Sequence, residues 1–296
     1  MSLLEKLVQE HPLSADMESA ETIEAKQAVL DTITPDVMRQ LESQPHEICH
    51  HMAAVYTKTV DEYLKTKHNR DIIDELAPFM DMLPNGAGVL DVGCGPGRDT
   101  LFMSVADQNF RLDWMGRERD GKTTREKYAV PKKVFKVVGI DVSEGMLERA
   151  NKRRLALEDL LLLDPFEVYP FFLYADMHAF VGGMLQGFDG IWSCTSLFTH
   201  TPYGLLETAM NSVSQALKSG GIFFASYTNG RGGKYDNLRV SRTGEIKYFS
   251  QPDPDEIKAL AGKFGLILTQ ESFSDFELNG KVIKKDLFAS QFFRKE

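Results

Sequence analysis

Apolar side chains recur every third or fourth residue through the first eighty or so positions, a spacing typical of amphipathic helices. The pattern predicts helices over 23–32, 35–42, 47–63 and 70–82. Pro84, Asn85 and Gly86 then end the helical pattern, and the short apolar run that follows is typical of a buried parallel strand. We therefore expect an N-terminal helical extension or lid over 1–83, followed by a sheet domain over 84–296.

From residue 88 onward, strand-like runs alternate with helix-like stretches, an order that predicts right-handed crossovers and a parallel sheet. The expected strands are 88–92, 135–140, 171–174, 188–194, 221–227, 266–273 and 287–294. The expected helices are 99–106, 143–162, 205–217 and 253–264, with Ser143 and Asp253 as N-caps. The predicted fold class is α/β: a doubly wound, mostly parallel seven-stranded sheet with helices on both faces.

One charged segment, residues 107–133, interrupts this alternation. It holds Gly116, Gly121 and Pro131, so we expect an exposed insertion between the first helix and the second strand of the sheet domain. A solvated loop and a lid or partner-binding segment both agree with this composition. The apolar run 160–163 is expected to extend the preceding helix.

Composition and charge narrow the class of protein. Hydrophobic residues make up 43% of the chain and charged residues 26%, which are ordinary values for a globular protein. The net charge of −9 argues against a general affinity for nucleic acid. Three cysteines without a C-x-x-C pair favour a reducing compartment, so we expect a cytoplasmic protein. The chain has neither a signal-peptide pattern nor a run of about 18 apolar residues, so no membrane span is expected.

A glycine-rich turn, Gly93-Cys94-Gly95-Pro96-Gly97, lies directly between the first predicted strand of the sheet domain and a predicted helix. Glycine permits positive φ and lets a ligand lie against the main chain, while the first N–H groups of the helix favour negative charge. A tight turn without a ligand would use the same residues. The neighbouring sequence therefore has to decide between the two interpretations.

The second strand ends at Asp141, where a carboxylate could accept hydrogen bonds from both hydroxyls of an adenosine ribose. A dinucleotide-dependent dehydrogenase would show the spacing G-x-G-x-x-G, whereas here Arg98 follows Gly97. The glycine spacing thus disfavours a nucleotide-dependent oxidoreductase, and Asp141 favours an adenosine-containing ligand.

These residues resemble the class I methyltransferases that depend on S-adenosyl-L-methionine (SAM), a family with a Rossmann-like sheet of seven strands, and in particular its small-molecule members. The resemblance covers roughly residue 53 to the C-terminus and rests on five segments in order: 89–99, 138–147, 175–177, 188–196 and 216–223. It implies SAM as the cofactor, with Asp141 on the ribose, Asp176 on the adenine amino group and Met177 on the adenine ring. The residues that it assigns to cofactor binding are Tyr56, Asp91, Gly93, Cys94, Gly95, Gly97, Arg98, Asp141, Val142, Met146, Asp176, Met177, Ser193 and Cys194.

The chain departs from the family in the spacing of its motifs. Fifty positions separate Asp91 from Asp141, whereas about twenty are usual between the first motif and the ribose carboxylate. The insertion over 107–133 accounts for the excess and leaves the motifs intact. The insertion therefore leaves the identity of the acceptor or of a partner open, whereas it does not affect the expected cofactor binding. Ser219 stands where the family has proline.

Candidate residues around the transfer site follow the fourth and fifth strands. His200 could act as a catalytic base, contact the substrate or play a structural role, and Tyr227 could line the acceptor pocket or belong to a turn. The resemblance places aromatic residues near 248–250 over the substrate, and Tyr56 on a helix that closes over SAM. No cluster of residues has the spacing of a metal site.

The sequence thus predicts an enzyme, a SAM-dependent methyltransferase that acts on a small-molecule acceptor by in-line displacement. Methylation of RNA or its cap, and a SAM-fold binding or scaffold protein without catalysis, remain alternatives. Neither the acceptor nor the choice between monomer and homodimer follows from the sequence.

Overall fold

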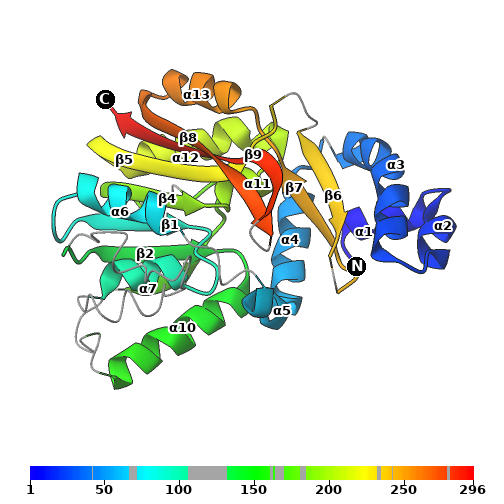
Figure 1. Cartoon of the computed structure of the whole chain (residues 1–296), viewed down its shortest axis with the longest axis horizontal. Helices are drawn as coiled ribbons and strands as arrows, with labels where there is room; N and C mark the ends of the chain where they lie inside the picture. The colour runs from blue at the N-terminus through cyan, green and yellow to red at the C-terminus, as the bar shows by residue number, and fades with distance from the viewer. Residues whose placement is uncertain are drawn as a thin grey trace.

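The computed structural model describes residues 1–41, 43–66, 72–105, 132–160, 163, 170–180, 185–231, 235–241, 243–278 and 281–296. Its main sheet has seven strands in the order β3-β2-β1-β4-β5-β9-β8, and β9 runs antiparallel to both of its neighbours (Figure 1). The strands are β1 Gly88–Val92, β2 Lys136–Asp141, β3 Phe171–Tyr174, β4 Phe188–Cys194, β5 Leu217–Thr228, β8 Leu266–Leu278 and β9 Lys281–Lys295. The predicted fold class, a mostly parallel seven-stranded sheet, is confirmed.

Helices cover both faces of this sheet, because successive side chains of a strand point in opposite directions. On β5, Phe223 packs with one layer and Phe224 with the other. The layer on the Phe223 side contains α12 (Leu206–Ala216) and α13 (Pro254–Lys263), and the layer on the Phe224 side contains α6 (Ile73–Met82) and α7 (Arg98–Ser104). The sheet is therefore doubly wound, as expected.

Two helices begin at the predicted caps. The Ser143 side chain accepts a hydrogen bond from the Met146 N–H at the start of α10 (Glu144–Asp159), and Asp253 caps α13 in the same way. A short helix, α11 (Leu197–His200), and a 3₁₀ turn, η1 (Tyr203–Leu205), follow β4. Together these caps and turns fix how the chain leaves each strand end.

The N-terminal helices form a separate layer beside the sheet (Figure 1). They are α1 Leu3–Glu10, α2 Ser14–Ser19, α3 Ile23–Leu41, α4 His46–Lys58 and α5 Val60–Thr66. The first four pack on a two-stranded antiparallel sheet, β6 (Asp236–Val240) with β7 (Ile246–Ser250), which the sequence did not predict. One hydrophobic cluster thus joins the N-terminal helices to a segment that follows β5.

Two of the predicted helix boundaries in this layer are wrong. α3 continues through Pro35, where the sequence indicated a break, because the face that carries Leu30 is buried and Thr34 donates its hydroxyl to the Leu30 carbonyl at 2.7 Å. The helix expected from residue 47 is divided at Thr59. There both the N–H and the hydroxyl bind the Val55 carbonyl, which ends α4.

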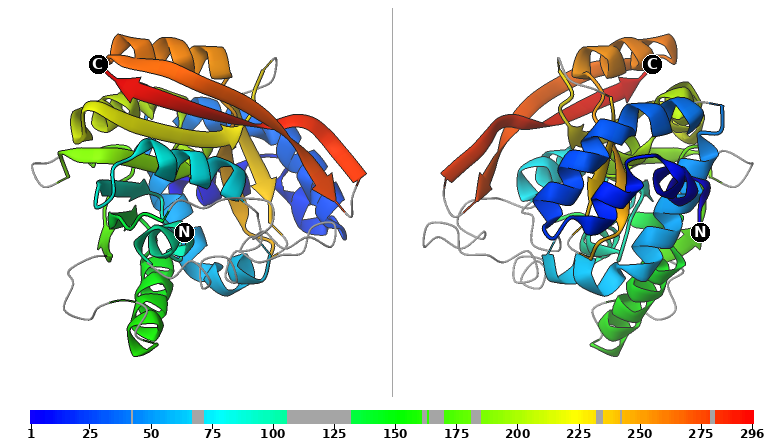
Figure 2. Two further views of the ribbon diagram at one scale, coloured as in Figure 1. Left: turned by 60° about the vertical axis from the view of Figure 1, so that its left-hand side comes forward. Right: turned by 90° about the vertical axis from the view of Figure 1, so that its right-hand side faces the viewer.

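β8 and β9 are longer than predicted and extend past β5 as a twisted arm (Figure 2). β9 pairs with β5 only as far as Phe288, whereas it pairs with β8 as far as Lys281. The charged insertion over 107–133 lies outside the described residues apart from Lys132 and Lys133, and the apolar run 160–163 is described only at its two ends. Of the helices that the structure describes, none is both long and apolar enough to cross a membrane.

Candidate functional site

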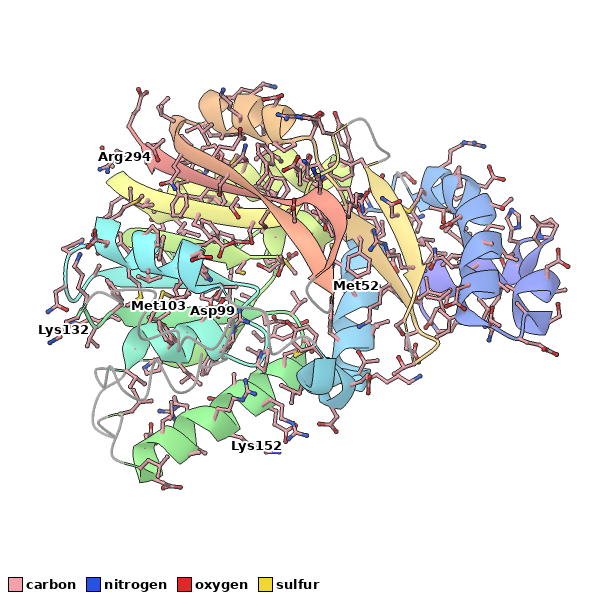
Figure 3. All side chains as sticks on the ribbon, in the orientation of Figure 1. Met52, Asp99, Met103, Lys132, Lys152 and Arg294 are labelled. Atoms are coloured by element: carbon pink, nitrogen blue, oxygen red, sulfur yellow. The ribbon has the colours of Figure 1, made fainter. Side chains whose placement is uncertain are left out.

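The carboxyl ends of the parallel strands β1, β2, β4 and β5 meet at one edge of the sheet, where a cavity of about 400 Å³ opens. Strand ends, α4 and the β6–β7 sheet all contribute residues to its wall. Figure 3 shows Asp99 at the sheet edge and Met52 on α4, on the far side of this space. The volume lies within the range of roughly 300–1,000 Å³ that small-molecule sites occupy.

The glycine turn forms the floor of the cavity, and its three glycines have different roles. All have positive φ: 70° at Gly93, 54° at Gly95 and 79° at Gly97. A Cβ on Gly93 would lie 2.4 Å from the Ser196 side chain, and one on Gly97 would lie 2.7 Å from Phe172. A Cβ on Gly95 would meet nothing within 4 Å. Gly93 and Gly97 therefore allow close packing of the protein, whereas Gly95 presents bare backbone to the cavity.

Asp141 lies beside this turn at the end of β2 and is 8% exposed. Its two carboxylate oxygens accept hydrogen bonds from the N–H groups of Gly95 at 2.9 Å and Ser143 at 2.8 Å. Burial raises the pKa of Asp141 from 3.8 to about 6, and the backbone hydrogen bonds oppose this rise. The carboxylate is thus oriented by the main chain and largely ionised at neutral pH.

A second acidic group lies under the turn. Asp91 accepts a hydrogen bond from Thr100 Oγ1 at 2.6 Å, and burial together with the charge of Asp99 raises its pKa. Asp99 binds Arg98 Nε at 2.6 Å and accepts the Trp192 indole N–H at 3.0 Å. Asp91, Asp99 and Asp141 all line the cavity beside the cation Arg98, so this end of the cavity favours a ligand that carries positive charge.

The side of the cavity nearest β2 and β3 is apolar, with Val142, Met146 and Met177 in its wall. Asp176 does not reach this wall. Its carboxylate instead accepts hydrogen bonds from the backbone N–H and the ring Nδ1 of His178, at 2.8 and 2.9 Å. Burial alone would raise the pKa of Asp176, but the bonds from His178 outweigh it and lower the value to about 2. Both bonds end on Oδ1, so the contact of Asp176 with an adenine stays a prediction.

Two further predicted cofactor residues lie behind the cavity and support it. The Ser193 hydroxyl lies 2.9 Å from that of Ser196, which in turn donates to the Val92 carbonyl and so ties β4 to β1. Gly97 packs against Phe172 and does not line the cavity. The other predicted cofactor residues, Tyr56, Asp91, Gly93, Cys94, Gly95, Arg98, Asp141, Val142, Met146, Met177 and Cys194, do line it.

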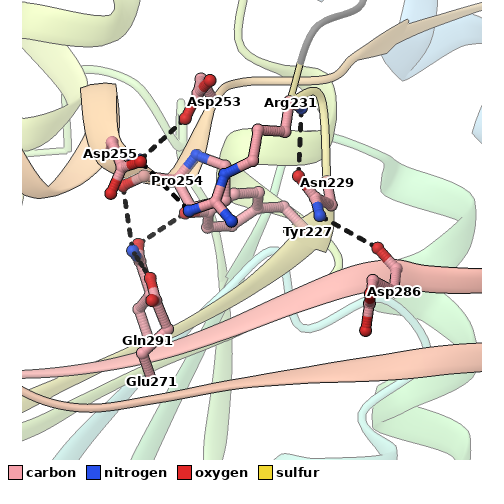
Figure 4. A network of polar contacts seen from close by, with 9 residues as sticks. All are labelled: Tyr227, Asn229, Arg231, Asp253, Pro254, Asp255, Glu271, Asp286 and Gln291. Atoms are coloured by element: carbon pink, nitrogen blue, oxygen red, sulfur yellow. Dashed lines mark hydrogen bonds and ion pairs between the residues drawn. The ribbon is translucent and has the colours of Figure 1, made fainter.

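The structure does not place Tyr227 where the sequence led us to expect it. The side chain is fully buried on the α13 side of the sheet, where it packs on Phe198 and donates its hydroxyl to Gln291 Oε1 at 2.5 Å (Figure 4). The side-chain amide of Gln291 donates to Glu271 and to the Pro254 carbonyl. Because alternate residues of a strand face opposite ways, Thr228 lines the cavity in place of Tyr227.

His200, by contrast, lines the cavity, and its hydrogen bonds define its tautomer. Nδ1 lies 3.2 Å from the Tyr248 carbonyl, which can only accept, so Nδ1 carries the proton. Nε2 then has a lone pair and accepts the Tyr56 hydroxyl at 3.0 Å. Burial raises the pKa of Tyr56, so the phenol stays neutral and donates to His200. In the neutral ring, with its proton on Nδ1, the basic nitrogen Nε2 therefore faces Tyr56 at the cavity wall.

Tyr56 reaches this position because α4 packs closely on the start of α10. A Cβ on Gly145 would lie 2.9 Å from the Thr57 carbonyl oxygen, so glycine is needed for the two helices to approach. The Thr57 hydroxyl also lies 3.0 Å from that of Ser143, the cap of α10. The N-terminal helices are thus anchored to the sheet domain at the point where they cover the cavity.

Sequence reasoning missed several residues of the wall: Cys49, Met52, Tyr63, Asp99, His178, Thr195, Ser196, Thr199, Thr228, Arg239, Leu287 and Phe288. Thr195, with φ 50°, directly follows the fourth strand and could have been found from its position. Arg239 could not, because β6 was not predicted. Phe249, in the aromatic segment that was expected over the substrate, does line the cavity. Among the described residues, no group of three His, Cys, Asp or Glu side chains is arranged to hold a metal ion.

Comparison with known proteins supports the fold. The chain matches no protein-family model and no curated protein sequence. Among solved structures it is similar to 1,6-didemethyltoxoflavin-N1-methyltransferase from Burkholderia thailandensis, solved with its acceptor and S-adenosylhomocysteine. The identity is 16% and the TM-score 0.54, over 85% of this chain and 90% of that one. It is also similar to the methyltransferase CcbJ from Streptomyces caelestis, with 16% identity and a TM-score of 0.53 over 81% and 96% of the two chains.

A third similar structure has another activity: the [4+2]-cyclase SpnF, with 14% identity and a TM-score of 0.54, over 82% of this chain and 94% of that one. At these identities the likeness concerns the fold alone. The chain has the class I SAM-dependent methyltransferase fold, as the sequence motifs indicated. What the chain does must be argued from its own site.

Proposed function

We propose that this protein is an enzyme that transfers a methyl group from SAM to a small-molecule acceptor. The observation that carries the proposal is the pairing of Asp141 with Gly95 at the floor of the cavity. The carboxylate is fixed by backbone hydrogen bonds beside a glycine whose Cβ position is open. A carboxylate held in this way accepts both hydroxyls of a ribose, while the bare turn admits the rest of a nucleoside ligand.

The remaining wall fits the other parts of SAM. Met177 and Met146 form an apolar surface suited to an adenine ring, and the acidic end beside Arg98 suits the methionine portion. SAM carries a sulfonium and an ammonium, and the carboxyl groups of Asp99 and Asp141 favour such charge, while Arg98 can pair with its carboxylate. The fold neighbour solved with S-adenosylhomocysteine (SAH) agrees with this assignment.

When bound, SAM supplies a methyl group already activated by the positive sulfur. The work left to the protein is mainly alignment, which can lower a barrier by roughly 7 kcal/mol or more. His200 Nε2 lies at the wall between α4 and the β6–β7 sheet, with its lone pair directed at Tyr56. Bound SAM would supply the methyl group and its sulfur would leave as the neutral thioether of SAH, while His200 Nε2 would take the proton of an acceptor O–H or N–H through the Tyr56 hydroxyl that donates to it.

Label transfer from SAM that carries a CD₃ methyl group tests this proposal. The protein is incubated with this SAM and the small-molecule fraction of a cell extract, and products that carry CD₃ are sought by mass spectrometry together with SAH. We expect labelled product and an equal amount of SAH. SAM that binds without SAH formation in any fraction would contradict methyl transfer and would favour a binding protein, or a reaction that uses the fold differently.

A variant at the proposed base separates chemistry from binding. His200→Gln should slow label transfer about 100-fold, since a positioned base contributes roughly 10²–10⁴ in rate, and should leave SAH affinity unchanged. His50→Gln, at an exposed position on α4, is the matched control and should retain full activity. An unchanged rate in His200→Gln would refute the base assignment alone.

A further inference from the structure

A second cavity of about 250 Å³ adjoins the first and shares Tyr56, Tyr63, Arg239 and Phe249 with it. Most of its wall is apolar, although five of the lining residues carry hydroxyl groups: Tyr56, Thr59, Tyr63, Ser241 and Thr243. Its charged lining residues are Arg239, Lys247 and Glu62. Two cations and one acid thus stand in a mostly apolar wall, an excess of positive charge within a chain of net charge −9.

The two cations lie directly opposite each other. In the register of β6 with β7, Arg239 pairs with Lys247, so both side chains project from the same face. Leu238 and Tyr248 project from the other face and pack on the N-terminal helices. Like charges directly opposite in an antiparallel pair destabilise it, so the sheet alone gives no reason for this arrangement.

Both cations are fixed by aromatic rings. The Arg239 guanidinium lies 5.1 Å from the ring centre of Phe249, and Lys247 Nζ lies 4.5 Å from that of Tyr56. Lys247 also donates to Thr59 Oγ1 at 3.4 Å. The Arg239 guanidinium makes no hydrogen bond or ion pair with any described residue, and the negative charge of Asp31 acts on it only from a distance. Its planar fork of donors is therefore available to a ligand.

This face is continuous with the proposed transfer site. The Phe249 ring contacts the Arg239 guanidinium and also packs on His200, at 5.4 Å between ring centres. The Tyr56 ring contacts Lys247, and its hydroxyl donates to His200. A molecule with its nucleophile at His200 thus has a neighbouring cavity lined by Arg239 and Lys247 in which to place another group. A group there that carries negative charge would offset the repulsion between the two cations.

We propose that the methyl acceptor carries an anionic oxygen group, a carboxylate or a phosphate, which binds between Arg239 and Lys247 while its nucleophile faces His200. This inference rests on the proposed methyl transfer, and it adds the charge of the substrate. The guanidinium supplies two parallel N–H donors, the geometry that both carboxylate and phosphate accept. Of the lining residues that the structure describes, Glu62 alone is acidic, so an anionic group of the acceptor would balance the second positive charge.

The test is the CD₃ transfer assay with products separated on an anion exchanger before mass spectrometry. We expect the labelled product to be retained on the exchanger, and product released by alkaline phosphatase treatment would identify phosphate in place of carboxylate. Arg239→Gln should reduce label transfer at limiting extract by about tenfold or more. It should leave SAH affinity unchanged, because the proposed SAH contacts come from the glycine turn, Asp141 and Met177 and not from β6.

Arg231→Gln is the matched control. Arg231 also lies over a phenylalanine, Phe273 at 5.3 Å, but it pairs with Asp255 and does not line either cavity. It should transfer label at the wild-type rate. Labelled product that passes through the exchanger, or equal transfer by Arg239→Gln and Arg231→Gln, would overturn the anionic acceptor and leave methyl transfer standing. No transfer by the wild type would overturn both, and no SAH binding would locate the failure at the cofactor.

Discussion

Replacing Asp141 by asparagine separates ligand recognition from folding, because the same carboxylate affects both. In the unliganded protein the ionised group is buried, and the difference between a pKa of 3.8 and one of about 6 corresponds to roughly 3 kcal/mol of lost stability at alkaline pH. A neutral asparagine amide would not carry this cost. It would, however, leave one of the two backbone N–H donors, Gly95 or Ser143, without an acceptor, at about 1–3 kcal/mol.

The two effects nearly cancel at pH 8, so Asp141→Asn should unfold within about 2 kcal/mol of the wild type. The pKa of Asp141 is raised in the folded state, so its favourable contribution is complete below about pH 4 and is lost as pH rises through about 6. Between pH 8 and pH 5 the wild type should therefore recover about 1.5 kcal/mol that the variant cannot. Denaturant unfolding at the two pH values measures this difference.

Ligand binding should respond quite differently. Two hydrogen bonds from ribose hydroxyls to a charged acceptor contribute roughly 1.5 kcal/mol or more each, so Asp141→Asn should weaken SAH binding about 100-fold at pH 8. Calorimetric titration measures the loss. A variant that binds SAH as tightly as the wild type, or whose stability relative to the wild type does not change with pH, would refute the reasoning for Asp141.

Three other predictions follow from the same site. Gly93→Ala should lose about 2–5 kcal/mol of unfolding free energy, since its Cβ would lie 2.4 Å from Ser196 at positive φ. Gly95→Ala should lose only about 1 kcal/mol, for its positive φ, but should bind SAH poorly. Equal losses of stability in the two variants would contradict the different roles of the two glycines. Tyr227→Phe should lower thermal stability by about 1 kcal/mol and leave label transfer unchanged, and a slower transfer would show that this buried hydroxyl matters to the site. Burial raises the pKa of Asp91, so SAM affinity should rise with pH as this acid ionises beside the cationic ligand. Calorimetry in buffers of different ionisation enthalpy should then detect proton release on binding. A SAM affinity that does not change with pH would refute the coupling between Asp91 ionisation and SAM binding.

Much of the sheet and the cofactor half of the cavity could be predicted from local sequence. The glycine turn and Asp141 lie directly after parallel strands, and the carboxyl ends of such strands meet at one edge whatever the connections between them. The caps Ser143 and Asp253 are local signals for the same reason. Position along the chain was sufficient to predict a residue's place wherever that place depends only on the strand or helix end at which the residue lies.

The proposed acceptor half could not be predicted, because it depends on packing between distant segments. Arg239 and Phe249 face the cavity only because β6 and β7 pair and bury their other face on α3 and α4. Tyr227 was expected at the cavity, but its neighbour Thr228 lines it instead. Successive residues of a strand face opposite sides of the sheet, and the order of the motifs does not show which residue faces which side. The bond from the buried His178 ring to Asp176 Oδ1 was not predicted either, because it depends on how the loop after β3 folds back.

The most direct test of the central claim is a calorimetric titration of the wild-type protein with SAM, with SAH and NAD titrated in parallel. We expect saturable binding of SAM and SAH at a single site, accompanied by a rise in thermal stability, and no binding of NAD. Absence of heat and of any thermal shift with SAM and SAH would contradict the claim, as would binding of NAD in their place.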